Sequence, residues 1–116
     1  SVFSPEDAAE IIRTRAADLL NIKLMKTGGI WQALKICSLA EMYGVECMIG
    51  CMLESKLAVS AAAHLAAAKR VITRADLDGP SLCKADPFTG GPLYENGVIR
   101  MTDAPGIGIT RVPAFV

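Results

Sequence analysis

Three short apolar segments recur along the chain at almost constant spacing. They are LLNIKLM (19–25), VECMIG (45–50) and ITRADLD (72–78). Lys23 and Met48 are 25 positions apart, and Met48 and Asp76 are 28 apart, so successive strand-plus-helix units have nearly the same length. Short continuous apolar runs that alternate with helical patterns are typical of parallel strands buried in one sheet. The spacing therefore predicts an α/β fold built from consecutive βα units.

Helix signals fill the intervals between these segments. Residues 5–17 follow Ser4, a good N-cap, and begin with Pro5 at the first helical position. Apolar residues then recur at helical spacing, as they do over residues 30–44 and 54–70. The second of these helices should stop at Gly44, because glycine accepts the left-handed backbone that ends helices. The expected order of elements is α-β-α-β-α-β.

The sequence pattern changes after Pro80, where alternating strand and helix signals give way to a hairpin signal. Asn96-Gly97 lies between PLY and VIRM, which is a strong signal for a two-residue β-hairpin. We therefore divide the chain into residues 1–80, which carry the βα units, and residues 81–116, which form a β-ribbon and a tail.

The length limits what three such strands can form. A chain of 116 residues is long enough for one structural unit. Three parallel strands do not close a barrel and leave open sheet edges, whereas a whole (β/α)8 barrel takes roughly 250 residues. The pattern fits either a small open α/β domain or part of a larger barrel. Because the chain begins without methionine, we expect a processed, cleaved or partial product.

Composition excludes several classes of partner. Twelve basic and twelve acidic residues cancel, which argues against a nucleic-acid-binding protein. No apolar run approaches the 18 or more residues of a membrane span, so no membrane segment is expected. Four cysteines stand in apolar contexts with no signal peptide before them, and we expect a reducing, cytoplasmic location.

Two lysines in the first apolar segment need an explanation, because burying a lysine is costly. In an extended strand Lys23 shares a face with Asn21, and Lys26 lies on the opposite face. We interpret Lys26 as a residue at the strand end that reaches solvent or the following helix. Lys23 lies deeper, where it is either a general base, since burial makes a lysine easier to deprotonate, or the partner of a buried carboxylate.

Acidic residues follow the second and third segments. Asp76 and Asp78 should lie on one face of a strand end with Leu77 opposite, and two such carboxylates favour a cation between them: a metal, a lysine or a substrate ammonium. The alternative is a turn, because Asp-Gly is common in turns. Glu54 comes just after the second strand, where barrel enzymes keep functional groups, although it can equally be a first-turn helix acid.

These segments together resemble a known family. NIKLMKTGG, VECMIGCMLESKLAVSAAAHLAA, ITRADLDGP and GIGI resemble the C-terminal part of enolase-superfamily enzymes of the muconate-lactonizing subgroup, and within it the dipeptide epimerases. The resemblance covers about residues 1–109. It implies a partial (β/α)8 barrel made of strands six to eight, followed by a ribbon that packs on a capping region. The Asp-x-Asp pair is the feature that separates dipeptide epimerases from their relatives.

The resemblance also implies roles for particular residues. Lys23 matches an acid/base catalyst, Asp76 and Asp78 match the pair that holds the substrate ammonium, and Lys26 and Glu54 are secondary candidates. The implied reaction is a 1,1-proton transfer on a dipeptide such as L-Ala-L-Glu, with Mg²⁺ stabilising the enediolate. The matching metal ligands and the opposite lysine are not in this chain. The resemblance therefore implies the remaining barrel and capping domain as partners, a homo-oligomer, and no activity of this chain alone.

Three alternatives remain open. Other superfamily members, namely N-acylamino acid racemase, succinylbenzoate synthase and cycloisomerase, share the barrel, but the ammonium-binding pair argues against them. A non-catalytic module in which sheet edges pair between copies is a second alternative. The third is a small α/β domain that holds a cationic ligand with Asp76 and Asp78.

Overall fold

The computed structural model describes residues 2–114. Its central feature is one parallel sheet with strand order β1-β2-β3, which confirms the predicted parallel strands. The strands are β1 (Leu19–Lys23), β2 (Glu46–Gly50) and β3 (Ile72–Asp76). The helices of this part are α1 (Pro5–Arg13), α2 (Leu24–Thr27), α3 (Ile30–Tyr43) and α4 (Lys56–Ala68).

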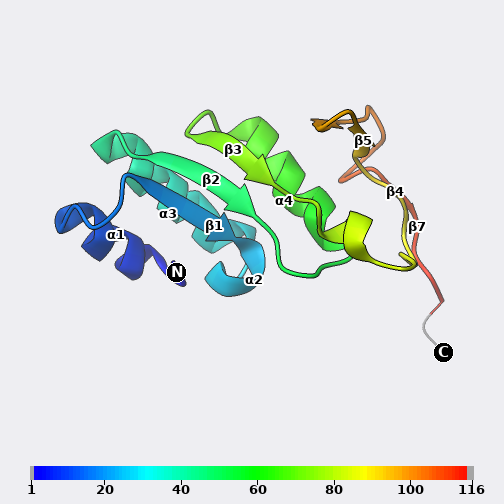
Figure 1. Cartoon of the computed structure of the whole chain (residues 1–116), viewed down its shortest axis with the longest axis horizontal. Helices are drawn as coiled ribbons and strands as arrows, with labels where there is room; N and C mark the ends of the chain where they lie inside the picture. Colours follow the sequence, from blue (N-terminus) through cyan, green and yellow to red (C-terminus); the bar gives the residue numbers. More distant parts are fainter. Residues whose placement is uncertain (1, 115–116) are drawn as a thin grey trace.

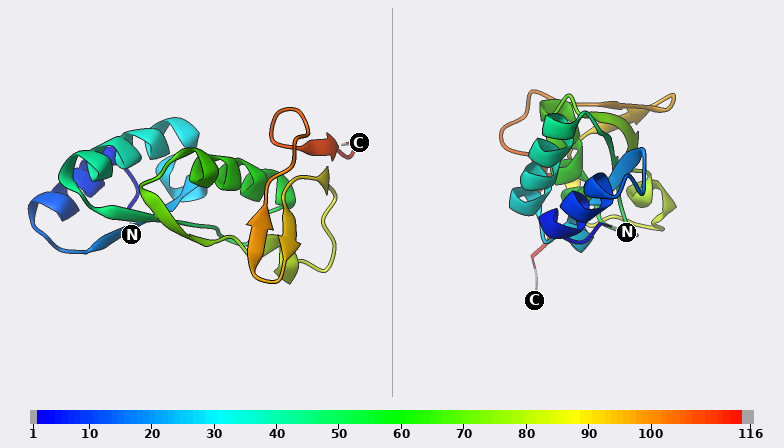
Figure 2. Two further views of the ribbon diagram at one scale, coloured as in Figure 1. Left: turned by 90° about the horizontal axis from the view of Figure 1, so that it is seen from above. Right: turned by 90° about the vertical axis from the view of Figure 1, so that its left-hand side faces the viewer.

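The sheet is covered by helices on one face only. Figure 2 shows the long helices in one layer and the strands in another, and none of the described helices packs on the opposite side of the strands. Side chains that point to the helices form the core, and the strand members are Leu20, Ile22, Cys47 and Ile49. The helices contribute mostly small residues, which lets them lie close to the sheet. All four cysteines are free thiols, and Cys37 and Cys47 belong to this core.

Helix α1 begins as predicted and ends earlier. The Ser4 hydroxyl accepts a hydrogen bond from the Asp7 backbone N–H at 3.1 Å, and Pro5 occupies the first turn. The prediction of a helix to residue 17 is wrong, because the last helical residue is Arg13. Thr14 caps the helix with its hydroxyl on the Glu10 carbonyl at 2.7 Å, and Arg15 has a left-handed backbone (φ 50°). These residues turn the chain back toward β1.

The first strand is also shorter than predicted. It ends at Lys23, and residues 24–27 form the single helical turn α2 instead of continuing the strand. Gly28 and Gly29 close this turn with φ values of 82° and 102°, a region that favours glycine, and both of their N–H groups bond to the Leu24 carbonyl. The predicted alternation therefore holds to Lys23 and is wrong for Lys26.

The other boundaries are close to those expected. Helix α3 spans Ile30–Tyr43 and ends at Gly44 in a left-handed conformation, as predicted. Helix α4 begins at Lys56, two residues after Glu54, so the interpretation of Glu54 as a first-turn acid is wrong. Strand β3 ends at Asp76, so Asp78 lies beyond the strand and immediately before the 3-10 helix η1 (Gly79–Leu82).

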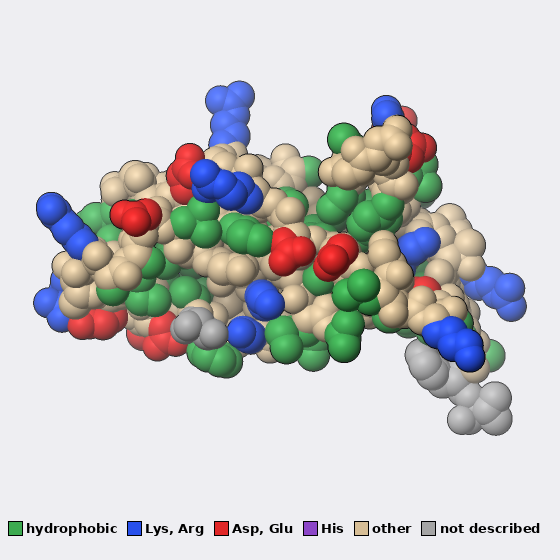
Figure 3. All heavy atoms as spheres, viewed as in Figure 1, with side chains coloured by type: hydrophobic (Ala, Val, Ile, Leu, Met, Phe, Trp, Pro, Cys, Tyr) green, Lys and Arg blue, Asp and Glu red, His purple; other side chains and the backbone are tan. Residues whose placement is uncertain are grey.

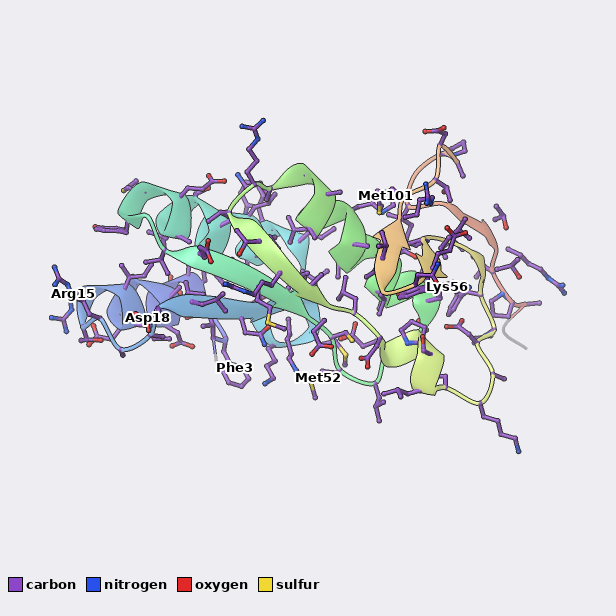
Figure 4. The ribbon with its side chains drawn as sticks, turned by 45° about the horizontal axis from the view of Figure 1, so that its top comes forward. Phe3, Arg15, Asp18, Met52, Lys56 and Met101 are labelled. Carbon is purple, nitrogen blue, oxygen red and sulfur yellow. The ribbon has the colours of Figure 1, made fainter. Side chains whose placement is uncertain are left out.

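The C-terminal segment forms two small antiparallel ribbons beside α4 (Figure 1). Strands β5 (Leu93–Glu95) and β6 (Val98–Arg100) pair as a hairpin whose turn residues Asn96 and Gly97 both have positive φ, as the sequence predicted. Strand β4 (Thr89–Gly90) pairs with β7 (Ile109–Arg111). The segment is tied to the rest of the chain where Asp86 accepts a hydrogen bond from the backbone N–H of Lys56, at the start of α4 (Figure 4).

The helices of the described chain are short. The longest, α3, has 14 residues, whereas a membrane-spanning helix needs about 20. Within residues 2–114, no helix is long and apolar enough to cross a membrane.

Candidate functional site

The register of the sheet aligns three residues across the carboxyl ends of the strands. Lys23 is paired with Gly50, and Gly50 is paired with Asp76. Side chains at these positions point to the face without helices, because the neighbouring Ile22 and Ile49 point into the core. Ligands of parallel α/β sheets bind outside the carboxyl ends of the strands. The structure thus places Lys23 and Asp76 on the open face at that end of the sheet.

Gly50 makes room for the lysine side chain. A Cβ atom added at Gly50 would lie 2.8 Å from Asn21 Oδ1 and 3.1 Å from Lys23 Cε. The Lys23 side chain therefore lies across β2, in the space that any larger residue would fill. Nothing in the sequence marks Gly50 as a site residue, since a glycine that ends an apolar strand looks like an ordinary turn.

Lys23 is half-buried, and its ammonium lies beside a methionine sulfur. The Nζ atom donates to Met52 Sδ at 3.9 Å, from the loop that follows β2 (Figure 4). The ion pairs among residues 2–114 join other side chains: Arg13–Glu10, Lys69–Glu41, Arg74–Glu46 and Arg100–Glu95. The alternative in which Lys23 neutralises a buried carboxylate has no support in these contacts.

Asp76 and Asp78 flank a buried residue. Leu77 is 2% exposed, whereas both aspartates are exposed, so the two carboxylates lie at the surface on either side of a buried residue. The backbone of Asp78 is helical (φ −85°, ψ −3°), and its carbonyl accepts from the Ser81 N–H at 2.8 Å. Its side chain makes no capping hydrogen bond to η1. The backbone of Asp78 thus builds a turn while its carboxylate stays available.

Tyr94 supports the loop between the two aspartates. Its hydroxyl, which comes from strand β5, donates to the Leu77 carbonyl at 3.0 Å. Burial raises the pKa of Tyr94 to about 12, and the nearby acidic groups of Cys51, Asp78 and Asp86 add to the effect. The two aspartates and Tyr94 line one cavity of about 340 Å³, whose wall includes the hairpin turn of β5 and β6. The sequence indicated this hairpin, but nothing in it indicated a contact with Leu77.

Glu54 shapes the loop after β2. Its side chain is 7% exposed, and Oε1 accepts a hydrogen bond from the Met52 backbone N–H at 2.8 Å. Gly79 packs against the same loop, because an added Cβ there would lie 2.8 Å from the Met52 carbonyl oxygen. These contacts position Met52, which in turn lies against Lys23. The contacts of Glu54 within the described residues therefore fit a role in positioning the loop.

Lys26 is placed apart from the row of Lys23 and Asp76. It lies on α2, and its Nζ stands 5.6 Å from the centre of the Phe3 ring. Of the five candidates, the structure brings Lys23, Asp76 and Asp78 to one end of the sheet, sets Glu54 behind the adjoining loop, and turns Lys26 toward the N-terminal segment.

Charged groups of both signs gather on the open face of the sheet. Figure 3, which views this face, shows acidic and basic side chains close together over the strands. Within residues 2–114, however, no group of three His, Cys, Asp or Glu side chains converges where a metal ion could be held. The described residues therefore do not form a complete metal site.

Almost the entire chain matches one protein family. Residues 1–114 match the family described as enolase C-terminal domain-like. The L-Ala-D/L-Glu epimerase of Clostridium acetobutylicum is 65% identical over 112 residues, which is 97% of this chain and 31% of that relative. The chain thus spans about 30% of the length of the curated relatives that it matches.

Solved structures have the same fold over the same region. A substrate-liganded complex of the L-Ala-D/L-Glu epimerase from Bacillus subtilis superposes with a TM-score of 0.91 at 55% identity, covering 94% of this chain and 30% of that one. A dipeptide epimerase from Enterococcus faecalis, complexed with Mg and the dipeptide L-Leu-L-Tyr, gives a TM-score of 0.90 at 46% identity, covering 95% of this chain and 32% of that one.

Proposed function

The chain belongs to the enolase C-terminal domain-like family, and on this basis we propose that it carries one acid/base lysine and the ammonium-binding aspartates of a dipeptide epimerase. The relatives with high identity are epimerases, and the solved relatives include complexes with dipeptides. The single observation that carries the proposal is the row of Lys23, Gly50 and Asp76 on the open face of the sheet.

Lys23 is proposed to exchange a proton with the α-carbon of the substrate. A neutral lysine amine on one side of that carbon takes the proton, and a second group on the opposite side returns one, so the configuration inverts without net loss of atoms. Because Gly50 has no side chain, the lysine can lie across β2 and reach along the sheet, and Met52 limits where its Nζ can lie. The second proton donor would come from outside this chain.

Asp76 and Asp78 are proposed to hold the substrate ammonium. Two exposed carboxylates at one strand end attract a cation, and the backbone between them is fixed by the bond from Tyr94 to Leu77. A dipeptide held there by its N-terminal ammonium would extend along the strand ends toward Lys23. Glu54 is assigned a supporting role at the margin of this site, through the loop that carries Met52, whereas Lys26 is turned toward Phe3 and is assigned no part in the reaction.

The finer architecture follows from the same proposal. Residues 1–80 would be the last three βα units of a (β/α)8 barrel, and residues 81–116 would pack on a capping region; residues 1, 115 and 116 lie outside the described part. The open edges of β1 and β3 are where further strands would join. Mg²⁺, which the Enterococcus faecalis structure contains, would then be held by residues outside this chain and would stabilise the charge of the enediolate.

The test joins this chain to the remainder of a relative. Residues 1–114 replace the matching 30% of the Bacillus subtilis enzyme, and the chimera is incubated with L-Ala-L-Glu and Mg²⁺ in D₂O. Solvent deuterium should appear at the α-carbon of the glutamate residue, as seen by NMR. Lys23→Ala should lower the rate of epimerisation between L-Ala-L-Glu and L-Ala-D-Glu by about 10²- to 10⁴-fold, the usual contribution of a general base. Deuterium exchange should fall for the epimer whose α-proton faces Lys23.

Two further variants separate the proposed roles. Lys26→Ala is the matched control, because it removes a lysine three positions away that is turned toward Phe3, and it should retain most of the exchange. Asp78→Asn should raise KM for L-Ala-L-Glu more than it lowers kcat. A folded chimera in which Lys23→Ala epimerises the dipeptide as fast as the parent would disprove the assignment of Lys23.

A further inference from the structure

The sulfur atom of Met52 lies against a charged group. From the loop that follows β2, its Sδ atom accepts a hydrogen bond from Nζ of Lys23 at 3.9 Å (Figure 4). A thioether is a weak acceptor, so this contact holds the ammonium only loosely. Met52 is also 43% exposed, so a small solute can reach its side chain. The structure thus sets an accessible, oxidisable sulfur directly beside a lysine ammonium.

Both members of this contact are held in place. The Met52 N–H donates to Oε1 of Glu54 at 2.8 Å, and a Cβ added at Gly79 would lie 2.8 Å from the Met52 carbonyl oxygen. The lysine side chain lies over Gly50, where an added Cβ would be 3.1 Å from Cε of Lys23. The sulfur and the ammonium therefore stay next to each other, because the loop is fixed on one side and the lysine on the other.

Carboxylates do not compete for this ammonium in the described part of the chain. The ion pairs among residues 2–114 join other side chains. Asp76 is in the same row of the sheet as Lys23, but Gly50 of the middle strand separates the two. Lys26, three positions away in the sequence, is turned toward Phe3. A stronger acceptor at the Met52 sulfur would therefore alter the surroundings of the Lys23 charge.

Peroxide converts a thioether into such an acceptor. A lone pair of the sulfur attacks one oxygen of hydrogen peroxide, an S–O bond forms as the O–O bond breaks, and water leaves. The sulfur is oxidised by two electrons and the peroxide is reduced, which gives methionine sulfoxide. The 3.9 Å between Sδ and Nζ is about 1 Å longer than a hydrogen bond from an ammonium to an oxygen. An oxygen bonded to the sulfur can therefore lie between the two atoms, at a bent angle, and accept from the lysine.

We propose that Met52 is a modification site, where hydrogen peroxide forms a methionine sulfoxide whose oxygen holds the Lys23 ammonium. The ammonium then keeps its proton more firmly, so Lys23 reacts more slowly as a neutral amine. The change is reversible, because methionine sulfoxide reductases restore the thioether. This effect does not rest on the proposed function. If Lys23 is also the proposed base, the oxidised site would lose proton exchange at the substrate α-carbon.

The thiol next to Met52 is a slow competitor for peroxide. Cys51 precedes Met52 in the same loop, but burial raises the pKa of its thiol, and nearby carboxylates add to the effect. The thiolate is the form of cysteine that reacts with peroxide, so Cys51 is oxidised slowly. A thioether has no proton to lose, and its oxidation does not require ionisation. Cys83, which is exposed, is best replaced by serine in the experiment.

Chemical acetylation of the chain tests the proposal. Cys83→Ser protein is treated with hydrogen peroxide until Met52 is converted, then with dithiothreitol, which reverses disulfides and sulfenic acids. A brief reaction with acetyl N-hydroxysuccinimide follows, and mass spectrometry after a protease that does not cleave at lysine gives the acetylation of each lysine. Oxidation should slow acetylation of Lys23 by about three- to tenfold, the effect of gaining one charge-assisted hydrogen bond at a half-exposed site. Lys26, which is also half-buried, should react at an unchanged rate.

Two variants assign the effect to a particular sulfur. Met52→Leu keeps nearly the same side-chain volume without the sulfur, and peroxide should then leave the acetylation of Lys23 unchanged. Met42→Leu is the matched control, because Met42 is 75% exposed on the outer side of α3, which the described residues leave uncovered. This variant should respond to peroxide as its parent does. Circular dichroism before treatment verifies that each variant is folded.

Reversal provides an independent readout. Methionine sulfoxide reductase should restore the original rate at Lys23 as it removes the oxygen from Met52. The proposal would be overturned by an unchanged rate at Lys23 once Met52 carries the oxygen. Equal slowing in Met52→Leu, or slowing that persists after the sulfoxide has been reduced, would overturn it as well.

Discussion

The two faces of the sheet use the same strands for different purposes. On the covered face Leu20, Ile22 and Ile49 are at most 1% exposed, whereas on the open face Asn21 and Asp76 are exposed and Lys23 is half-buried. The residues alternate along β1 and β2, although each strand has only five positions. This contrast shows that alternation along a strand places the apolar side chains on the covered face and the polar and charged side chains on the open face.

The covered face should dominate stability. Ile49→Ala is expected to lower the free energy of unfolding by about 2–5 kcal/mol, because it removes a fully buried side chain and leaves a cavity. Urea denaturation followed by circular dichroism measures the change. Met48→Ala, one position along β2 and on the open face, is the matched control and should cost clearly less. Equal losses for the two variants would show that the open face is packed as well.

Gly50 is the position where a single methyl group should disturb the open face. Gly50→Ala should cost about 1–3 kcal/mol of stability, because the new Cβ lies too close to Asn21 Oδ1 and Lys23 Cε. A double variant with Asn21→Ala should recover part of the loss, and a double-mutant cycle by urea denaturation gives the coupling. If the two changes are additive, the open face does not depend on this close approach.

Tyr94 tests how firmly the strand end is held. Tyr94→Phe removes the hydrogen bond to the Leu77 carbonyl and should lower stability by about 0.5–1.5 kcal/mol. Amide hydrogen exchange should increase in residues 76–79 and remain unchanged in β1. Uniform acceleration across the sheet would mean that the tyrosine contributes general packing and does not specifically hold the aspartate loop.

The same tyrosine predicts a small dependence of stability on pH. Its pKa is raised to about 12 in the folded chain, against about 10 in an unfolded one. Between these values the folded state binds more protons than the unfolded state, so stability falls as pH rises from about 10 to 12. Urea midpoints across this range should fall less for Tyr94→Phe than for wild type. Parallel curves for the two proteins would exclude Tyr94 as the source.

Much of the fold could be predicted from residue patterns. The apolar spacing indicated three parallel strands, Ser4 and Pro5 marked a helix start, Gly44 marked a helix end, and Asn96-Gly97 marked a hairpin. These features depend on neighbours within a few residues, which a sequence displays directly. The predicted boundaries were wrong where the chain changes direction, as after Arg13. The place of a turn depends on where both of the elements that it joins must lie.

The site was predictable in its residue types and less so in its geometry. Lys23 and Asp76 were candidates because a charged side chain in an apolar strand is costly to bury unless it is paired or used. The register of the sheet places the two residues in one row. Their proposed roles await the exchange experiment. The alternation could not show that Asp78 leaves the strand or that Lys26 sits on a helical turn over Phe3, because hydrogen bonds formed after the strand ends decide both.

The residue pattern alone was enough for the order of elements, the strands and helices, and the charged residues at the strand ends. Tertiary contacts were needed to establish that Gly50 must leave space for Lys23, that Tyr94 holds the Leu77 carbonyl, and that one side of α3 stays uncovered by the described residues. The cause is separation along the chain. Patterns report interactions between near neighbours, whereas these three features depend on contacts, or their absence, between segments that meet only after folding.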